Sequence, residues 1–294
     1  MLVTNKHNLP EPIYRALLGE SLGLERKFKF TPKHVGLTKL LMPPQIALLM
    51  ARHDDEIEED ASDRAWALDG IADHKVLEDT NMWNVIKEVP MSLTLDNWTI
   101  YMRLDLYHPF TLYDYKRTSV WSYIFGGRDE WEQQLNCYAY AARCNFALKI
   151  DRLRSILRFR DWQKNKAKTD KKYPPIPLHI VDVPIWSDNQ SSDFLRNRIS
   201  IYKKALESPD EELPPCSRED RWVRDTTWAV MRKGRKSALR VLNSKKEAED
   251  WMIINLTSPT GIYIEERPGQ SVRCEEYCAA RPFCRQYKEE ISAK

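Results

Sequence analysis

The spacing of apolar and polar residues changes several times along this chain, and each change marks an expected helix or strand. Apolar residues three and four positions apart predict helices over 63–79 and 129–146. The double proline at 43–44 predicts a helix that continues through 46–53, because proline is tolerated in a first turn. Ser62 is expected to cap the helix at 63–79, and the acidic run 54–60 to be a solvated loop. Further helices are expected over 12–18, 192–207 and 244–252.

Alternating apolar and polar residues, or short apolar runs between turn residues, predict the strands. They are expected over 85–95, 98–107, 111–116, 152–160, 178–186, 229–232, 237–242 and 262–266. Asp96 and Asn97 are a turn signal between the first two of these, so residues 85–116 are expected to form an antiparallel meander. The lysine-rich stretch 163–172 is expected to be a polar loop.

This order of elements indicates an α/β fold, in which helices flank a mixed sheet and a cysteine-bearing appendage follows. We expect a core over 1–206 that includes an N-terminal helical segment. Residues 207–219 are rich in proline and acidic residues and are expected to be a linker. Residues 220–294 would then be a C-terminal segment with a cysteine site.

Composition narrows the class of protein. The 294 residues are 42% hydrophobic and 11% aromatic, which excludes a disordered chain, and a formal charge of +3 gives no strong overall field. A site for nucleic acid would have to come from local basic patches. The chain has no apolar run of about 18 residues, so no membrane interaction is expected. Its first residues lack the apolar core of a secretory signal, so a reducing cytoplasm is the expected compartment.

The candidate catalytic residues lie in the predicted meander. If Pro109 and Phe110 form the centre of a turn, Asp105 faces Asp114 across two strands, about 5 Å away. Lys116 shares a face with Asp114, because residues two apart on a strand point the same way. Two adjacent carboxylates repel one another, and a divalent cation such as Mg²⁺ or Mn²⁺ resolves that conflict. The alternative is a surface hairpin that carries an ordinary charge pair.

The flanking helices carry further polar candidates. His74 lies on the helix before the meander, while Gln134 and Tyr138 lie four residues apart on the helix after it. Residues i and i+4 share one helix face, so Gln134 and Tyr138 could contact Lys116 or a DNA phosphate together. Taken singly, each of the three also fits an ordinary packed or surface position.

Four short motifs together carry a resemblance to a known superfamily. They read GIADH at 70–74, RLDL at 103–106, DYKRT at 114–118 and QLNCY at 134–138. In order and spacing they resemble the PD-(D/E)xK nuclease superfamily, and its RecB-type exonuclease branch most closely. That branch includes phage recombination exonucleases and CRISPR-associated exonucleases that carry an iron–sulfur cluster. The resemblance implies a restriction-endonuclease-like fold, in which a mixed sheet is flanked by helices.

The resemblance also implies roles for individual residues. The metal would be held by His74, Asp105, Asp114 and the backbone carbonyl of Tyr115. Lys116 would be the catalytic lysine, and Gln134 and Tyr138 would orient the lysine and the substrate. The second acidic position is Asp114, where many relatives have glutamate.

The cysteines fall into two groups. Cys137 and Cys144 lie in an apolar helical stretch and are interpreted as core thiols. Cys216, Cys274, Cys278 and Cys284 form a late group that suits a [4Fe–4S] cluster, a structural Zn²⁺ or no metal at all. The resemblance favours the cluster, although the upstream cysteine of cluster-bearing relatives lies nearer the N-terminus and their first spacing is one residue shorter.

Two basic stretches are candidates for contact with DNA, because lysine and arginine bind phosphates without reading sequence. The candidate residues are Lys164, Lys166, Lys168, Arg232, Lys233 and Arg235. Each stretch is also compatible with a solvated basic loop.

Together these features predict a Mg²⁺- or Mn²⁺-dependent DNA exonuclease of phage recombination or DNA-end processing, with DNA as its substrate. A single-strand annealing protein is a candidate partner, and a phage origin would place the enzyme in the cytoplasm of a bacterial host. Two alternatives remain open at this point. One is a catalytically silent subunit for DNA binding or assembly, and the other is a nuclease that trims DNA ends in CRISPR adaptation.

Overall fold

The computed structural model describes residues 2–19, 30–79, 83–124, 129–256, 258 and 260–292, without the side chains of residues 66, 67, 74, 77 and 78. The chain divides into two compact units, Met1–Leu213 and Pro214–Lys294. No helix among the described residues is long and apolar enough to cross a membrane.

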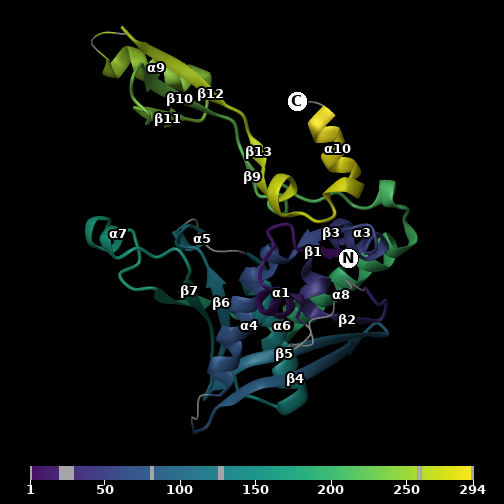
Figure 1. Cartoon of the computed structure of the whole chain (residues 1–294). Coiled ribbons are helices and arrows are strands. Elements are labelled where there is room, and N and C mark those ends of the chain that lie inside the picture. The colour runs from purple at the N-terminus through teal and green to yellow at the C-terminus, as the bar shows by residue number, and fades with distance from the viewer. Residues whose placement is uncertain are drawn as a thin grey trace. The chain divides into compact units, whose positions relative to one another are not determined.

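A six-stranded mixed sheet organises the first unit (Figure 1). Its strands are β2 (His34–Gly36), β4 (Ile86–Leu95), β5 (Trp98–His108), β6 (Thr111–Thr118), β7 (Arg152–Phe159) and β8 (Leu178–Val183). β4, β5 and β6 pair antiparallel, which confirms the predicted meander. β7 runs parallel to β6, β8 antiparallel to β7, and β2 parallel to the start of β5. The predicted α/β class, a mixed sheet with helices on it, is confirmed.

The helices of the first unit are α1 (Glu11–Leu18), α2 (Leu37–Leu41), α3 (Pro44–Arg52), α4 (Ala65–Glu78), α5 (Val120–Ile124), α6 (Asp129–Phe146), α7 (Lys164–Thr169) and α8 (Asp188–Glu207). Of these, α2 and α6 pack on the strands of the sheet. α6 contacts β4, β5, β6 and β7, and its buried Leu135, Ala139 and Ala142 let it lie close to the strands. Acidic residues fill its first turn and Arg143 its last, which suits the helix dipole.

Several sequence-based expectations are corrected. Residues 58–60 of the acidic run form a strand, β3 (Glu58–Asp60), which pairs with β1 (Leu2–Thr4). Asp60 rather than Ser62 is the cap, because its carboxylate accepts the Ser62 N–H at 3.0 Å at the start of the 3₁₀ turn Ala61–Arg64 that precedes α4. The stretch 163–172 is not all loop, since it contains α7. α8 begins at Asp188, four residues earlier than expected, because Ser187 and Gln190 form a capping box.

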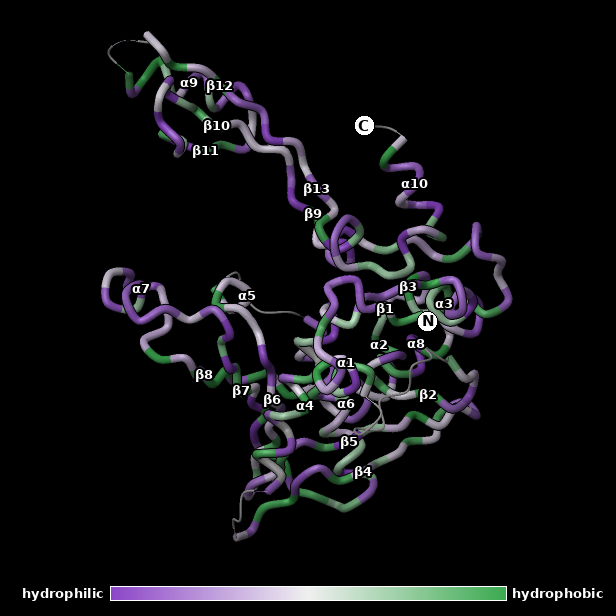
Figure 2. The backbone as a smooth tube through the Cα atoms, in the orientation of Figure 1, coloured by the Kyte–Doolittle hydropathy of each residue, from purple (hydrophilic) through white to green (hydrophobic). Residues whose placement is uncertain are grey.

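The second unit has little buried apolar surface and two small sheets. Its elements are β9 (Val223–Arg224), β10 (Thr227–Arg232), β11 (Arg240–Leu242), α9 (Lys245–Asn255), β12 (Ile262–Arg267), β13 (Gln270–Ser271), a π turn (Arg273–Tyr277), a 3₁₀ turn (Arg281–Phe283) and α10 (Arg285–Ser292). β10 is the central strand between β11 and β12, and β9 pairs with β13. In the tube of Figure 2, α10 and α7 are mostly hydrophilic, whereas α3 is largely hydrophobic.

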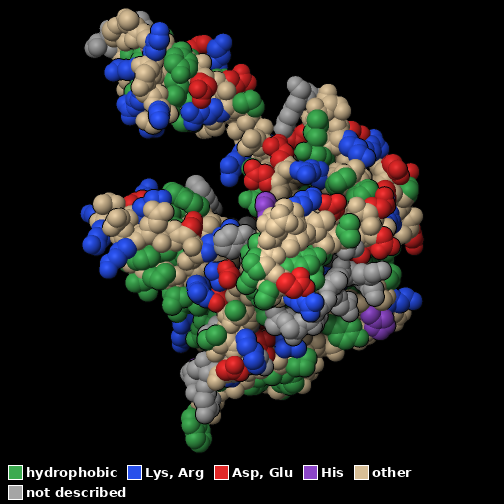
Figure 3. All heavy atoms as spheres, in the orientation of Figure 1, with side chains coloured by type: hydrophobic (Ala, Val, Ile, Leu, Met, Phe, Trp, Pro, Cys, Tyr) green, Lys and Arg blue, Asp and Glu red, His purple; other side chains and the backbone are tan. Residues whose placement is uncertain are grey.

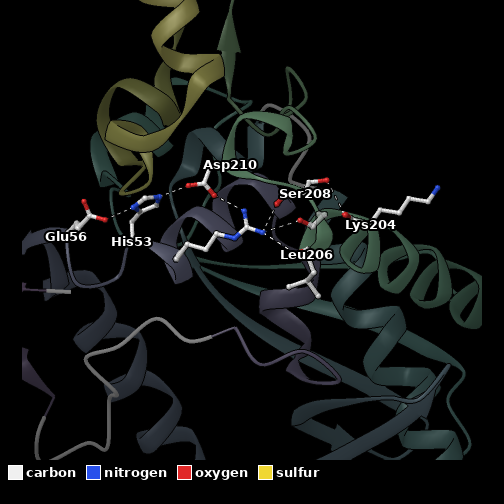
Figure 4. A network of polar contacts seen from close by, with 8 residues as sticks. His53, Glu56, Lys204, Leu206, Ser208 and Asp210 are labelled. Atoms are coloured by element: carbon white, nitrogen blue, oxygen red, sulfur yellow. Dashed lines mark hydrogen bonds and ion pairs between the residues drawn. The ribbon is translucent and has the colours of Figure 1, made fainter.

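A polar network closes the C-terminal end of α8 within the first unit (Figure 4). Arg52 bonds Asp210 at 2.7 Å and donates to the backbone carbonyls of Ala205, Leu206 and Ser208. His53 lies between two carboxylates, with 2.6 Å from Nδ1 to Glu56 and 2.6 Å from Nε2 to Asp210. Burial opposes protonation of His53, but its bonds to Asp210 and Glu56 outweigh that effect and raise its pKa above 6.5.

This network makes residues 208–213 sensitive to pH. A raised pKa in the folded state means that the stabilisation by His53 is complete below about pH 6.5 and is lost as pH rises through the folded-state value. We therefore expect faster hydrogen exchange at the amides of Ser208, Glu212 and Leu213 above that value, after correction for the intrinsic rate. His53→Gln should remove this pH dependence and His108→Gln, at the exposed turn, should retain it; equal profiles for wild type and His53→Gln would contradict the assignment.

Candidate active site

A tight turn fixes the relative position of β5 and β6. His108 pairs with Thr111, Tyr107 with Leu112 and Leu106 with Tyr113, so the predicted turn at Pro109 and Phe110 is confirmed. Phe110 adopts a positive φ of 63°, which an aromatic residue rarely does. Three hydrogen bonds and one cation–π contact hold it there. The Tyr107 hydroxyl accepts its N–H, its carbonyl accepts the N–H groups of Asp151 and Arg152, and the Lys149 ammonium lies 5.0 Å from its ring centre.

Beyond this turn the ladder between β5 and β6 ends just before the candidate acidic residues. Its last pair is Leu106 and Tyr113, so Asp105 and Asp114, at the next position, are not a ladder pair. Instead the Asp105 carboxylate accepts the backbone N–H of Tyr115 at 2.9 Å. A side-chain oxygen thus takes a donor that would otherwise be available to the β-ladder, and this explains why the pairing stops here.

A chain of hydrogen bonds runs from β6 to α6. The Lys116 ammonium lies 2.9 Å from Oδ1 and 2.8 Å from Oδ2 of Asp114. It also donates to Oε1 of Gln134 at 2.8 Å, and Nε2 of Gln134 donates to the Tyr138 hydroxyl at 2.8 Å. Both ends of the Gln134 amide are therefore used, and the amide can adopt only one orientation without losing a bond.

The two acids of the site are buried and its two tyrosines are neutral. Asp114 is 1% exposed and Asp105 8% exposed. Burial, and then the nearby Asp105 charge, raise the pKa of Tyr115 to about 12. The same two causes raise the pKa of Tyr138 further, and Asp114 adds to the effect. Both hydroxyls therefore keep their protons at neutral pH, and both carboxylates lie close enough to Tyr138 to act on it.

Two residues of this region were not anticipated from the sequence. Asn136 is fully buried, donates to the Pro184 carbonyl at 3.0 Å and accepts the Trp186 N–H at 2.7 Å, which fastens the segment after β8 to α6. Ser155 pairs with Asp114 across β6 and β7, is 1% exposed, and its Oγ has no hydrogen-bond partner among the described residues. A polar residue at an inward position between Leu153 and Leu157 is the sequence signal that could have singled it out.

The chemistry of the donor set fits a hard divalent cation. Asp105, Asp114 and Lys116 sum to a charge of −1 when all three are ionised, and a buried excess negative charge favours a cation. Carboxylates and the carbonyl of Tyr115 are ligands that Mg²⁺ and Mn²⁺ prefer. The predicted fourth ligand is the side chain of His74, which lies outside the described residues. Among described side chains, no three His, Cys, Asp or Glu residues are arranged to hold a metal ion.

The predicted DNA-contact residues lie on exposed segments of both units. Lys164, Lys166 and Lys168 are on α7, between β7 and β8, where Figure 3 shows basic side chains gathered. The Lys166 ammonium lies 5.7 Å from the ring centre of Trp121 on α5. In the second unit, Arg232 ends β10, and Lys233 and Arg235 occupy the exposed turn after it.

The four late cysteines all belong to the second unit, where their charges affect one another without forming a metal-binding group. Burial is the main cause that raises the pKa of Cys274 to about 11, and the charges of Cys278 and Cys284 add to it. Burial likewise raises the pKa of Cys216, with smaller effects of Asp220 and of the other three cysteines. The Gln286 side chain bonds both the N–H and the carbonyl of Cys216, at 2.9 and 3.0 Å, and so ties α10 to this segment. Of the two predicted core thiols, Cys137 is fully buried, but Cys144 is exposed, which corrects that expectation.

Comparisons with known proteins give distant structural likenesses. No family model and no curated protein matches the chain. A crystal structure of SSO0001 matches with a TM-score of 0.44 and 14% identity, over 67% of this chain and 86% of the other. A crystal structure of a protein from Eubacterium rectale, named a putative exonuclease, matches with a TM-score of 0.29 and 15% identity, over 50% and 56%. Since both scores are below 0.5, we base the functional proposal on the geometry of the site.

The bond between Gln134 and Tyr138 has a measurable consequence. Tyr138→Phe removes the hydroxyl and leaves a partly buried N–H of Gln134 without its acceptor, which should lower the free energy of unfolding by about 1 kcal/mol. Urea unfolding measures this change. Tyr140→Phe, on the same helix, is the matched control, because the Tyr140 hydroxyl bonds no described residue. An equal loss in both variants would show that the bond contributes nothing.

Proposed function

We propose that this chain is a Mg²⁺- or Mn²⁺-dependent DNA exonuclease that hydrolyses phosphodiester bonds. One observation carries the proposal: the Lys116 ammonium is held between Asp114 and Gln134, beside a second buried carboxylate at Asp105. A fixed cation next to two buried acids suits a reaction in which negative charge develops on phosphorus oxygens. The preference for DNA ends is inferred from the resemblance of the motif order to RecB-type exonucleases.

Each side chain has a distinct task in this proposal. Asp105, Asp114 and the Tyr115 carbonyl would hold the metal, which when bound supplies Lewis-acid stabilisation of charge on the phosphate. Lys116 Nζ would offset charge in the transition state and orient the attacking water. Gln134 keeps Lys116 in place, and Tyr138 keeps Gln134 in place, since the three are joined in one bonded chain. The exposed lysines of α7 would bind the DNA backbone.

The proposal predicts a strict dependence on Lys116 and Asp114. With Mg²⁺ or Mn²⁺ and end-labelled DNA, Lys116→Ala and Asp114→Asn should each lower the rate of hydrolysis by a factor of about 10² or more. The reason is that each removes a charge from the buried centre of the site. Rates of product release from the labelled end measure the effect.

The matched controls are Arg15→Ala and Glu11→Gln, which alter an exposed ion pair of α1 in the same unit. Both should retain the wild-type rate. Hydrolysis that is equal in all five proteins, or absent from all, would refute the proposal. Metal-independent DNA binding without hydrolysis would favour the alternative of a silent DNA-binding or assembly subunit. A co-purified adaptation integrase would favour end trimming in CRISPR adaptation, and a strand-annealing partner would favour phage recombination.

We further propose that Cys216, Cys274, Cys278 and Cys284 hold a [4Fe–4S] cluster, with Zn²⁺ as the alternative. Support comes from the donor set, since four thiolates suit either group, and from the effect of the other three cysteine charges on Cys216. Thiols with raised pKa values must lose protons to bind metal, so loading should release protons.

Anaerobic purification followed by metal and sulfide analysis tests this site. We expect iron and sulfide in the wild type, and loss of both in Cys278→Ser and Cys284→Ser but not in the exposed control Cys144→Ser. Zinc without sulfide would select the alternative. Protein that binds neither metal in any preparation would show that the four residues are free thiols.

A further inference from the structure

Ser155 is a buried serine whose hydroxyl the fold leaves unused. Its side chain is 1% exposed, and its Oγ makes no hydrogen bond to any residue that the structure describes. Burial of a hydroxyl without a hydrogen bond costs free energy, so such groups are rare in folded proteins. Where one occurs, its partner is often an ordered water or a bound ion.

The register of the sheet places Ser155 beside the candidate active site. Its direct partner on β6 is Asp114, and its direct partner on β8 is Val181. Paired residues of neighbouring strands, which lie about 4.8 Å apart, project from the same face of a sheet. Lys116 projects from that face as well, because it lies two positions after Asp114. Of the two register partners of Ser155, Asp114 is the polar one, so the polar side of the serine is the side of the candidate active site.

Ser155 and Asp114 nevertheless do not bond each other directly. The Ser155 Oγ makes no hydrogen bond to the Asp114 carboxylate or to the Lys116 ammonium, which bond one another. Two polar groups that project from one face of neighbouring strands without bonding can be bridged by one water molecule. A hydroxyl suits such a bridge, because it can donate one hydrogen bond and accept two.

Packing alone does not explain a serine at this position. The neighbours of Ser155 on the same face of β7 are Leu153 and Leu157, which are 1% and 0% exposed, and α6 contacts this strand. A small side chain lets the helix approach closely, but alanine would do so without the cost of a buried hydroxyl. The hydroxyl therefore needs a reason other than volume.

A divalent cation at Asp105 and Asp114 would supply that reason. In protein sites Mg²⁺ keeps several water ligands, and the groups around a metal site orient its ligands through hydrogen bonds. The two carboxylates are used as ligands of the cation itself. A serine hydroxyl adds a neutral acceptor, so it can fix a water ligand without changing the charge of the site.

We propose that Ser155 is a positioning residue of the metal site, whose hydroxyl accepts a hydrogen bond from a water ligand of the cation held by Asp105 and Asp114. The proposal rests on the proposed function, because that function supplies the cation. It extends the ligand set inferred from the motif order, since Ser155 lies in none of the four motifs. When no cation is bound, the same hydroxyl is a cost to the stability of the fold.

Two measurements on the full chain separate this role from a structural one. The first is the affinity for Mn²⁺ alone, followed by electron paramagnetic resonance, which Ser155→Ala should weaken by about tenfold or more. The second is urea unfolding in EDTA, in which Ser155→Ala should be at least as stable as the wild type, because it removes an unsatisfied buried hydroxyl. At equal concentration, Mn²⁺ should then stabilise the variant less than the wild type.

Ser191→Ala is the matched control. Ser191 of α8 is also fully buried, and its Oγ likewise makes no hydrogen bond to a described residue. This variant should change stability in EDTA in the same direction as Ser155→Ala and leave the affinity for Mn²⁺ unchanged. Asp114→Asn removes a proposed ligand, so the Mn²⁺ binding that it abolishes is the binding that belongs to this site.

Several outcomes would overturn the proposal. They are equal Mn²⁺ affinity in Ser155→Ala and the wild type, an equal loss in Ser155→Ala and Ser191→Ala, and no Mn²⁺ binding by the wild type. Lower stability of Ser155→Ala in EDTA would also overturn it, because the hydroxyl would then have a structural partner.

Hydrolysis of end-labelled DNA by the same samples separates this proposal from the proposed nuclease function. Mn²⁺ binding that depends on Ser155, without hydrolysis, would support the positioning role and refute the nuclease. Hydrolysis by the wild type, together with equal Mn²⁺ affinity in Ser155→Ala, would do the reverse.

Discussion

The Lys116 ammonium group is the contact on which the arrangement of the first unit depends. It joins an acid of β6 to an amide of α6, so the strand and the helix that cover the buried acids are held at one separation. A lysine can be buried only where its charge is met, and Asp114 and Gln134 together meet it. The distance between α6 and the sheet therefore determines both the packing of the helix and the bonds of Lys116. The small residues of α6 allow the close approach that both require.

Local patterns predicted the elements that have strong periodicity of their own. α6 was predicted at its observed bounds, and the meander of β4, β5 and β6 was predicted within a few residues. The turn at Pro109 and Phe110 was also predicted, because proline marks its first central position. The short elements β1, β2, α2 and α5 were missed, since their few residues carry no period and they depend on partners distant in sequence.

The hydrogen bonds of the candidate site could not be predicted from the sequence. The order of Asp105, Asp114, Lys116, Gln134 and Tyr138 indicated which residues to consider, but not their bonds. The Asp105 carboxylate accepts the Tyr115 N–H, and the ladder between β5 and β6 ends after three pairs. No residue pattern predicted where that ladder ends. Ser155 likewise becomes noticeable only when β6 and β7 are placed side by side in register.

The short ladder between β9 and β13 has a consequence for how the second unit could vary. It brings residues 223–224 beside 270–271, and Gly269 fits there because a Cβ would lie 2.7 Å from the Arg224 carbonyl. The intervening segment contains β10, β11, α9 and β12, and its two ends therefore lie next to each other. A tight turn could replace this segment without disturbing Cys216, Cys274, Cys278 or Cys284, which lie outside it. It is thus a natural point for insertion, loss or exchange of a module.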